Sequence, residues 1–212
     1  IGATDPMWSM RPSRIDYNAA YHLINNNLLD ITHVAFVHPI TFGGAETSLS
    51  EPTVESLARG VRVTRSASNT PLPSITSQFT GEIGDLVLSY EFHIPGVFML
   101  HTLMYPSGTL ARHVDGKVDE EPSYALYTCQ MITPITDRTS AFFYANGPLA
   151  KHSETMEHVI EVGRVGFEED RRIIEGQQEV IDAFPNSRMH DLVMDRAMKI
   201  YYGIERRLRQ EE

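Results

Sequence analysis

The chain has 212 residues, with 18 Lys and Arg against 28 Asp and Glu, which gives a formal net charge of −10 at pH 7. This length suits a single domain, spanning residues 1–212, and the acidic balance argues against nucleic acid as a partner, because nucleic-acid-binding surfaces concentrate Lys and Arg. No run approaches the ~18 apolar residues of a membrane span, and the sequence does not begin with the basic and apolar regions of a signal peptide, so we expect a cytoplasmic protein without a membrane partner.

The single cysteine, Cys129, limits the redox chemistry that this chain can carry. One thiol cannot form an internal disulfide. It also cannot hold an iron–sulfur cluster alone, because such clusters need several cysteine or histidine ligands.

The first predicted element is a helix over residues 16–37. Its apolar residues recur at three- and four-residue steps, as on one face of a helix, and Asp16 is a suitable N-cap. Pro39 predicts an end near His38, because a residue that precedes proline is pushed out of the α region. Residues 39–50, rich in Gly, Ser and Thr, predict a loop beside this helix end.

The end of this helix carries an acid and two histidines, Asp30, His33 and His38, within an apolar run. Such polar groups are costly to bury without a partner or a metal, and a metal is one explanation. The alternative is a pair of hydrogen-bonded core histidines. On a regular helix of ~3.6 residues per turn, His33 and His38 would point ~140° apart, so a shared ligand requires the last turn to depart from α-helical geometry.

Residues 59–146 change to a strand-like pattern. Short β-branched and aromatic runs, separated by Gly, Pro, Asn and Asp, predict six strands. These runs cover residues 59–66, 74–80, 85–94, 97–105, 124–133 and 140–146. Tight turns at residues 95–96 and 134–138 favour an antiparallel meander, because parallel neighbours need long crossovers. Residues 106–123 predict a longer loop.

After residue 148 the helical period returns, with helices predicted over residues 153–183 and 187–210. A sheet followed by long helices, with one helix before it, is an α+β arrangement. The longer helix is expected to lie across the concave face of the sheet.

Neighbours three and four residues away indicate which acid of residues 168–170 points into the protein. Glu168 lies among arginines, which predicts a solvated, ion-paired position, and Glu169 is intermediate. Asp170 has glycine and apolar neighbours, so we expect it to be buried, and Gly166 one turn earlier would allow another group to come close. A buried Asp170 would complete, with the two histidines, the 2-His-1-carboxylate set that holds non-haem Fe(II). The alternative is a structural aspartate paired with a buried arginine.

Three segments together carry a resemblance to a known family. They are residues 27–38 (N-L-L-D-I-T-H-V-A-F-V-H), 128–134 (T-C-Q-M-I-T-P) and 167–170 (F-E-E-D). They resemble the catalytic domain of Rieske non-haem iron aromatic oxygenases, in particular the branch of vanillate O-demethylase and dicamba monooxygenase. The resemblance implies an α+β, helix-grip (START-like) fold, with an antiparallel sheet of about six or seven strands over a long C-terminal helix. It also implies that His33, His38 and Asp170 bind Fe(2+).

The same resemblance gives roles to four further residues. Asp30 would be the catalytic acid that connects the iron site with the Rieske cluster of a neighbouring subunit in a homotrimer. At a spacing of three residues its carboxylate could reach the His33 imidazole. The alternative is an ordinary acid at a helix end. Asn27, His101 and Gln130 would contact the substrate.

The resemblance further implies that this chain is one part of an electron-transfer system. Family members carry a [2Fe-2S] cluster on an upstream Rieske domain with C-x-H and C-x-x-H elements, which cannot be built from one cysteine. Electrons would come from NAD(P)H through a reductase or ferredoxin. Turnover with O2 should therefore fail unless a separate chain supplies the cluster.

Two classes of function follow. The first is an oxidoreductase, a monooxygenase, demethylase or dioxygenase that hydroxylates or oxidatively O-demethylates a small aromatic substrate. The second is a non-catalytic START-like protein that binds a hydrophobic small molecule. A mainly apolar pocket favours a neutral or singly anionic aromatic ether or methyl-arene. Its predicted lining comprises Phe36, Val97, Phe98, Met99, Leu100, Met131, Ile132 and Phe143.

Overall fold

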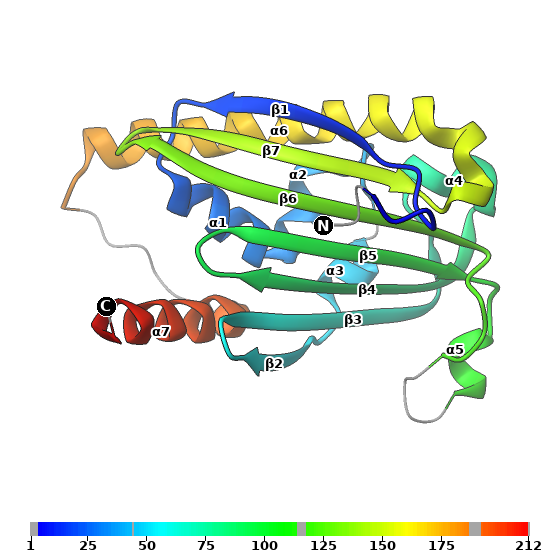
Figure 1. Cartoon of the computed structure of the whole chain (residues 1–212). Helices are drawn as coiled ribbons and strands as arrows, with labels where there is room; N and C mark the ends of the chain where they lie inside the picture. The colour runs from blue at the N-terminus through cyan, green and yellow to red at the C-terminus, as the bar shows by residue number, and fades with distance from the viewer. Residues whose placement is uncertain (1–3, 44, 114–117, 187–191, 212) are drawn as a thin grey trace.

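A seven-stranded antiparallel sheet is the centre of the molecule (Figure 1). The computed structural model describes residues 4–43, 45–113, 118–186 and 192–211. The strands lie in the order β1-β7-β6-β5-β4-β3-β2, so that the first strand closes one edge beside the last. Their bounds are β1 Arg11–Tyr17, β2 Thr53–Leu57, β3 Gly60–Pro71, β4 Ile83–His93, β5 Val97–Tyr105, β6 Tyr124–Thr136 and β7 Thr139–Pro148. The α+β prediction with an antiparallel meander is confirmed.

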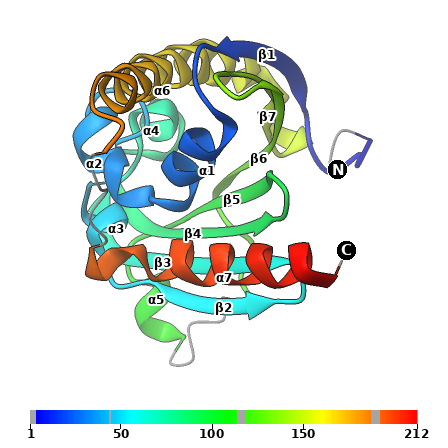
Figure 2. The same ribbon diagram turned by 90° about the vertical axis from the view of Figure 1, so that its left-hand side faces the viewer.

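The sheet curves around helix α1, and the long helix α6 runs beside β1 and β7 (Figures 1 and 2). Helix α7 packs near the opposite edge of the sheet, against β3 and β2. The α-helices are α1 Tyr21–Leu29, α2 Val34–Val37, α3 Ala45–Leu49, α4 Ser74–Thr80, α5 Thr109–Arg112, α6 Met156–Ala183 and α7 Arg196–Glu211. Three 3-10 turns, η1 Ile31–His33, η2 Ala150–Thr155 and η3 Val193–Asp195, complete the described elements. No helix among the described residues is long and apolar enough to span a membrane.

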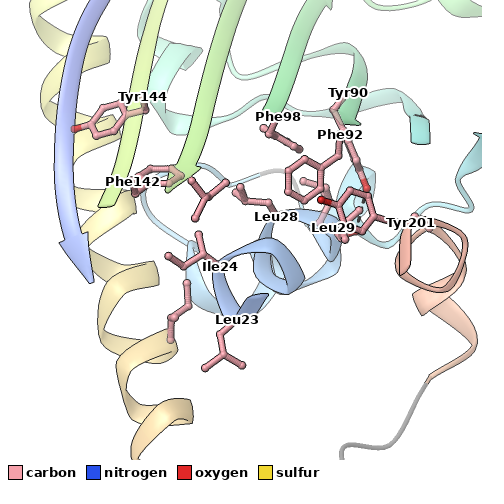
Figure 3. Packing of buried hydrophobic residues seen from close by; sticks show 14 of the residues in the cluster. Leu23, Ile24, Leu28, Leu29, Tyr90, Phe92, Phe98, Phe142, Tyr144 and Tyr201 are labelled. Atoms are coloured by element: carbon pink, nitrogen blue, oxygen red, sulfur yellow. Dashed lines mark hydrogen bonds between the residues drawn. The ribbon is translucent and has the colours of Figure 1, made fainter. Parts of the chain in front are cut away.

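The main core lies between α1, the inner face of the sheet and α7. Fully burying a large apolar side chain contributes ~1.5–3 kcal/mol, so this cluster fixes α1 inside the curve of the sheet. The ring of Tyr201 from α7 stacks on Phe92 from β4 at a centroid distance of 4.8 Å. Figure 3 labels Leu23, Ile24, Leu28, Leu29, Tyr90, Phe92, Phe98, Phe142, Tyr144 and Tyr201 of this cluster.

The helix predicted over residues 16–37 is wrong at its start and is interrupted before its end. Asp16 and Tyr17 belong to β1, where Tyr17 pairs with Ser140 of β7. This pairing is a long-range contact that helical spacing does not reveal. Helix α1 begins at Tyr21 and ends at Leu29, because Asp30 has the non-helical angles φ −99° and ψ 80°. A 3-10 turn and the short α2 continue the path to His38.

The strand predicted over residues 74–80 is helix α4. Pro73 precedes the helix, and its carbonyl accepts hydrogen bonds from the amides of Thr76 and Ser77. The β-branched residues of this segment favour a strand only where they can pair on a sheet, and here they cover an end of the sheet. Strand β2 lies at the mostly exposed sheet edge and was missed. Residues 106–123 contain the short α5, and the predicted helix start at residue 187 lies outside the described residues.

Candidate functional site

His33 and His38 meet because the chain leaves regular helix geometry between them. His33 is the last residue of the 3-10 turn η1, and His38 follows α2 with φ −117° and ψ 43°. The two imidazole rings lie 5.3 Å apart between centroids. The predicted departure from helical geometry is present, but it begins at Asp30, well before Pro39.

Asp170 of α6 faces both histidines. Its Oδ1 lies 3.0 Å from Nε2 of His38 and 3.4 Å from Nε2 of His33. One possible ligand atom from each of the three residues lies within 4.8 Å of the others. His38 is fully buried and Asp170 is 5% exposed. The structure thus brings together the three residues that the sequence predicts as metal ligands, and we call them the triad.

Charge stabilises the triad despite its burial. Burial raises the pKa of Asp170, but the hydrogen bonds from His33 and His38 outweigh it and lower this pKa from 3.8 to about 2. Burial lowers the pKa of His38, whereas hydrogen bonds to Asp170 and Glu169 outweigh burial and raise it above its ordinary value of 6.5. These opposite shifts reflect a site whose carboxylates favour a nearby positive charge.

Glu169 holds the second nitrogen of His38, a contact that sequence reasoning missed. Its Oε2 accepts hydrogen bonds from His38 Nδ1 at 2.9 Å and from Thr41 Oγ1 at 2.6 Å. Glu168, by contrast, pairs with Arg171 on the outer side of α6 at 2.5 Å, as predicted. The only indication in the sequence was that Glu169 has both apolar and charged neighbours on its helix. Its two partners lie on the segment that follows α2, far away in the sequence, so helical spacing could not reveal them.

Asp30 contacts His33 through its backbone and not through its side chain. The carbonyl oxygen of Asp30 lies at hydrogen-bond distance from His33 Nδ1. Its carboxylate instead accepts a hydrogen bond from the Thr32 amide at 3.0 Å and caps the 3-10 turn. The expectation that the carboxylate reaches the imidazole is therefore corrected, because the break in the helix turns the side chain back on its own chain.

Asn27 lies beside the triad. Its Nδ2 donates a hydrogen bond to Asp170 Oδ1 at 3.0 Å. The amide therefore orients the carboxylate, and the structure gives it a protein partner where the sequence predicted a substrate contact.

Phe42 packs between the triad and the core. Its ring lies 4.7 Å from the His38 ring and 5.8 Å from the Phe167 ring, measured between centroids. It fits there because Gly166 has no side chain, and a Cβ at Gly166 would overlap the Phe42 ring. The close approach predicted at Gly166 is made by this side chain.

A cavity of about 120 Å³ lies between the helices and the inner face of β4 to β7, and its lining includes neighbours of the triad residues but not the triad residues themselves. Ile31, Val34, Phe42 and Phe167 form its end near the triad residues. The rest of the lining is Gly43, Ser48, Pro73, Ile75, Leu86, Leu88, Leu100, Thr102, Leu126, Thr128, Gln130, Asn146 and Val159. Gln130 is one of the lining residues, and its contact with a substrate, which the family resemblance implies, stays a prediction.

The predicted apolar lining was largely wrong. Of the eight residues named, only Leu100 lines this cavity. Met131 and Phe143 are exposed on the outer face of the sheet, and Phe36 is 75% exposed beside the triad. Successive residues of a strand alternate between the two faces, and the sequence did not reveal which alternate set points inward. Phe98 and Ile132 do point inward, but they pack in the main core with residues of α1 and do not line the cavity.

His101 lies on the opposite face of the sheet from the cavity. Its neighbours Leu100 and Thr102 line the cavity, so alternation turns His101 outward. There its ring packs 5.7 Å from Trp8 and 4.6 Å from Tyr127, measured between centroids. The expectation of a substrate contact at His101 is corrected for this reason.

The triad residues fit a divalent metal by their chemistry. Two imidazoles and one carboxylate are the set typical of non-haem Fe(II) with open positions. Each histidine offers Nε2 to the centre, while Nδ1 is held by an acceptor, Glu169 for His38 and the Asp30 carbonyl for His33. Such outer hydrogen bonds fix the orientation of metal-binding histidines.

Comparison with known proteins gives matches over nearly the whole chain. The family model of the vanillate O-demethylase oxygenase C-terminal domain matches residues 17–211. The toluene-4-sulfonate monooxygenase system iron-sulfur subunit of Comamonas testosteroni is 31% identical over 199 residues, which cover 90% of this chain and 56% of that protein. The chain thus spans little more than half the length of this curated relative.

Solved structures share the fold at low sequence identity. Dicamba monooxygenase bound to dicamba has a TM-score of 0.79 and 16% identity, covering 98% of this chain and 61% of that chain. NdmA of Pseudomonas putida CBB5 with caffeine has a TM-score of 0.62 and 17% identity, covering 98% and 53%. At such identities the likeness establishes the arrangement of strands and helices.

Proposed function

This chain belongs to the vanillate O-demethylase oxygenase C-terminal domain family, and from this membership we propose that it is the catalytic domain of an Fe(II)-dependent oxygenase. The proposed substrate is a small aromatic compound, which is hydroxylated or loses an O-methyl group with consumption of O2. When bound, Fe(II) in a 2-His-1-carboxylate site supplies the activation of oxygen.

The observation that carries this proposal is the buried triad next to an apolar cavity. The ligand atoms of His33, His38 and Asp170 lie within 4.8 Å of one another. Ile31 and Val34, on either side of His33 in the chain, line the cavity. A flat ligand in the cavity would therefore lie near the site where these three residues would hold the metal.

The surrounding residues orient the triad and keep water away. Glu169 and the Asp30 carbonyl fix the two imidazoles, and Asn27 fixes the carboxylate of Asp170. The ring of Phe42 covers one side of His38. The apolar lining of the cavity excludes water and binds the aromatic ring by burial of its surface.

Electrons for this reaction would have to reach the site from outside the chain. We assign this role to a Rieske [2Fe-2S] cluster, reduced by NAD(P)H through a reductase or ferredoxin. In a homotrimer of the full-length oxygenase, Asp30 would connect the cluster of one subunit with the triad of the next. Its side chain caps the 3-10 turn that carries His33, so Asp30 is linked to one of the proposed iron-binding residues through a single turn of the chain.

Metal analysis tests the proposal. Protein reconstituted with Fe(II) without oxygen, then desalted, should hold about one iron per chain. The double variant His33→Ala with His38→Ala should hold almost none, whereas His22→Ala should keep the full amount, because His22 is exposed on α1, away from the triad.

Equal iron contents in the wild type and the double variant would contradict the oxygenase proposal. That outcome would favour the second function, a non-catalytic protein that binds a hydrophobic small molecule. The cavity supports this function because it is enclosed mainly by apolar residues. In that case an aromatic ligand should bind equally well to both proteins.

A further inference from the structure

A groove of about 300 Å³ adjoins the cavity near α2 and the start of α4. Val34 and Gly43 line both the groove and the cavity. Pro73 lines the cavity, whereas its chain neighbours Leu72 and Ser74 line the groove. Several residues of the groove, Ser74 among them, are exposed at the surface. The groove is thus open to solvent, and a thin layer of residues separates it from the cavity.

The backbone at Gly43 packs directly on the backbone at the start of α4. A Cβ added at Gly43 would lie 3.5 Å from the Cα of Pro73 and 3.5 Å from the backbone nitrogen of Ser74. Gly43 has a φ of 59°, a left-handed conformation that favours glycine. We call the contact of Gly43 with Pro73 and Ser74 the seam. Because these residues line the two hollows, the seam separates the cavity from the groove.

The hydroxyl of Ser74 holds the seam closed. Its Oγ donates a hydrogen bond to the Thr41 carbonyl at 2.6 Å and is also at hydrogen-bond distance from the Ile40 carbonyl. These carbonyls belong to the turn over residues 38–43, in which the Gly43 amide donates to the His38 carbonyl at 2.9 Å. The hydroxyl therefore joins α4 to the turn that carries Gly43, and we call this link the latch.

The latch is weaker than the neighbouring links. Thr41 Oγ1 donates to the Glu169 carboxylate at 2.6 Å, and Thr70 Oγ1 donates to the Glu46 carboxylate, also at 2.6 Å. Hydrogen bonds to a charged acceptor are roughly twice as strong as neutral ones. The latch has a neutral donor and neutral acceptors. The seam can therefore part at Ser74 while Thr41 stays bound to Glu169, which also orients His38.

We propose that aromatic ligands enter and leave the cavity through the groove and the seam, and that the latch at Ser74 sets the rate. This inference rests on the proposed function in one respect, because it takes the cavity as the site of the aromatic ligand. The latch is made whether the cavity is empty or filled. It therefore controls entry and exit equally and leaves the affinity unchanged, as a gating loop does.

Fluorine NMR exchange measurements on the full chain, prepared without iron, test the latch with 4-fluoroanisole, a small aromatic ether. Ser74→Ala should raise both the association rate and the dissociation rate about two- to tenfold, as expected for one neutral hydrogen bond, while the Kd stays the same. Ser77→Ala is the matched control. The Ser77 hydroxyl donates within α4, to the Ser74 carbonyl at 3.5 Å, so this variant should exchange the ligand as the wild type does.

A second variant tests the route itself. Ala35 lines the groove but not the cavity. Ala35→Trp places a large ring in the groove and should slow association and dissociation by a similar factor, with an unchanged Kd. Ala183→Trp is the control, because Ala183 is exposed at the end of α6, and it should leave both rates as in the wild type.

Unchanged rates in Ala35→Trp would overturn the route, and unchanged rates in Ser74→Ala would overturn the latch. A change of Kd through the dissociation rate alone would also contradict the inference, because it marks a residue of the binding site. Iron content after loading with Fe(II) separates the two proposals. Normal iron content with unchanged exchange rates contradicts only the route, whereas the expected rates in a wild type that cannot hold iron contradict only the oxygenase proposal.

Discussion

Glu169 contacts His38 on the nitrogen opposite to the one that faces Asp170. The neighbouring acids on α6 therefore have three different tasks. Asp170 faces both histidines, Glu169 orients one of them together with Thr41, and Glu168 pairs with Arg171 at the surface. This division allows the contribution of an orienting acid to be measured against a surface acid one residue away.

We expect Glu169→Ala to weaken Fe(II) binding by about 10- to 100-fold, the usual effect of removing a hydrogen-bond partner of a metal-binding histidine. Glu169→Gln should restore much of the affinity, because the amide oxygen can still accept from His38. Competition with a chelator measures the affinity. Glu168→Ala is the control and should bind Fe(II) as the wild type does, and an equal loss in both alanine variants would contradict the role of Glu169.

Asp30 offers a test of electron transfer separate from metal binding. In a protein that joins this chain to a Rieske domain, Asp30→Asn should keep the iron content and substrate affinity but slow electron transfer to the triad severely. The hydrogen bond from the Thr32 amide to the side chain of residue 30 should be kept, because Asn and Asp are similar N-caps. Rapid-mixing spectroscopy of cluster oxidation gives the rate. Iron loss as complete as in Asp170→Ala would show that Asp30 supports the metal directly.

At the residue scale, local spacing predicted the burial of Asp170 better than the hydrogen-bond partners of the triad. Asp170 could be selected because its neighbours at three and four residues are glycine and apolar. The contact of Glu169 with His38 joins residues 131 positions apart, and that of Asn27 with Asp170 joins residues 143 positions apart. Such contacts depend on how α6 lies against α1 and α2, which one sequence does not specify.

Among the elements, α6 contains glycines, which lower the intrinsic stability of a helix. One of them leaves room for a side chain that packs at the triad. Two of its glycines have opposite surroundings. A Cβ at Gly166 would overlap Phe42, whereas a Cβ at Gly176 would meet nothing within 4 Å. Phe42 in turn packs on the ring of His38. Gly166 is therefore needed for the packing of the site, and Gly176 is not.

We expect Gly166→Ala to destabilise the protein by about 1–3 kcal/mol, because overpacking must displace the Phe42 ring, and to weaken iron binding as well. Gly176→Ala should instead stabilise it by up to about 1 kcal/mol, since alanine is the better helix former. Urea unfolding measures both changes. A stabilised Gly166→Ala variant with normal iron content would mean that Phe42 moves freely.

Elements with a strong internal pattern were predicted well, and elements defined by their partners were not. The apolar strands β4, β5 and β6 and the long α6 follow from alternation and helical periodicity. Strands β1 and β2, at the two edges of the sheet, are mostly exposed and lack such a pattern. Helix α4 has the β-branched composition of a strand, but it follows Pro73, whose carbonyl accepts hydrogen bonds from the first turn, and it packs against α6.

For the whole molecule, the curved sheet and the helices on its inner face enclose both the triad and the cavity. Composition and element order predicted this α+β layering, and the family resemblance predicted the triad. The lining of the cavity could not be predicted, because a shift of one residue in a strand exchanges its inner and outer faces. The misplaced His101 and Met131 are outer-face residues of β5 and β6 for this reason.

The position of Cys129 leads to a prediction about the chain as a redox unit. It is the only cysteine, it is buried, and burial raises the pKa of its thiol. Thr128 and Gln130 line the cavity, so Cys129 faces the other side of the sheet. Its thiol is thus remote from the triad, and the iron that the chain binds should be mononuclear, without acid-labile sulfide.

The iron-loaded chain should therefore show no repeated turnover of an aromatic substrate with O2, NAD(P)H and a reductase. Without a cluster in the chain, electrons from the reductase have no carrier that ends near the triad, and Cys129→Ser should change neither the iron content nor this result. Product analysis by chromatography provides the measurement. The positive control adds a separate protein with a Rieske cluster. This protein supplies the electron carrier while the triad and the cavity stay the same, so product should then form. Sustained product formation with the reductase alone would contradict the prediction, since it would require a path for electrons that does not pass through a cluster.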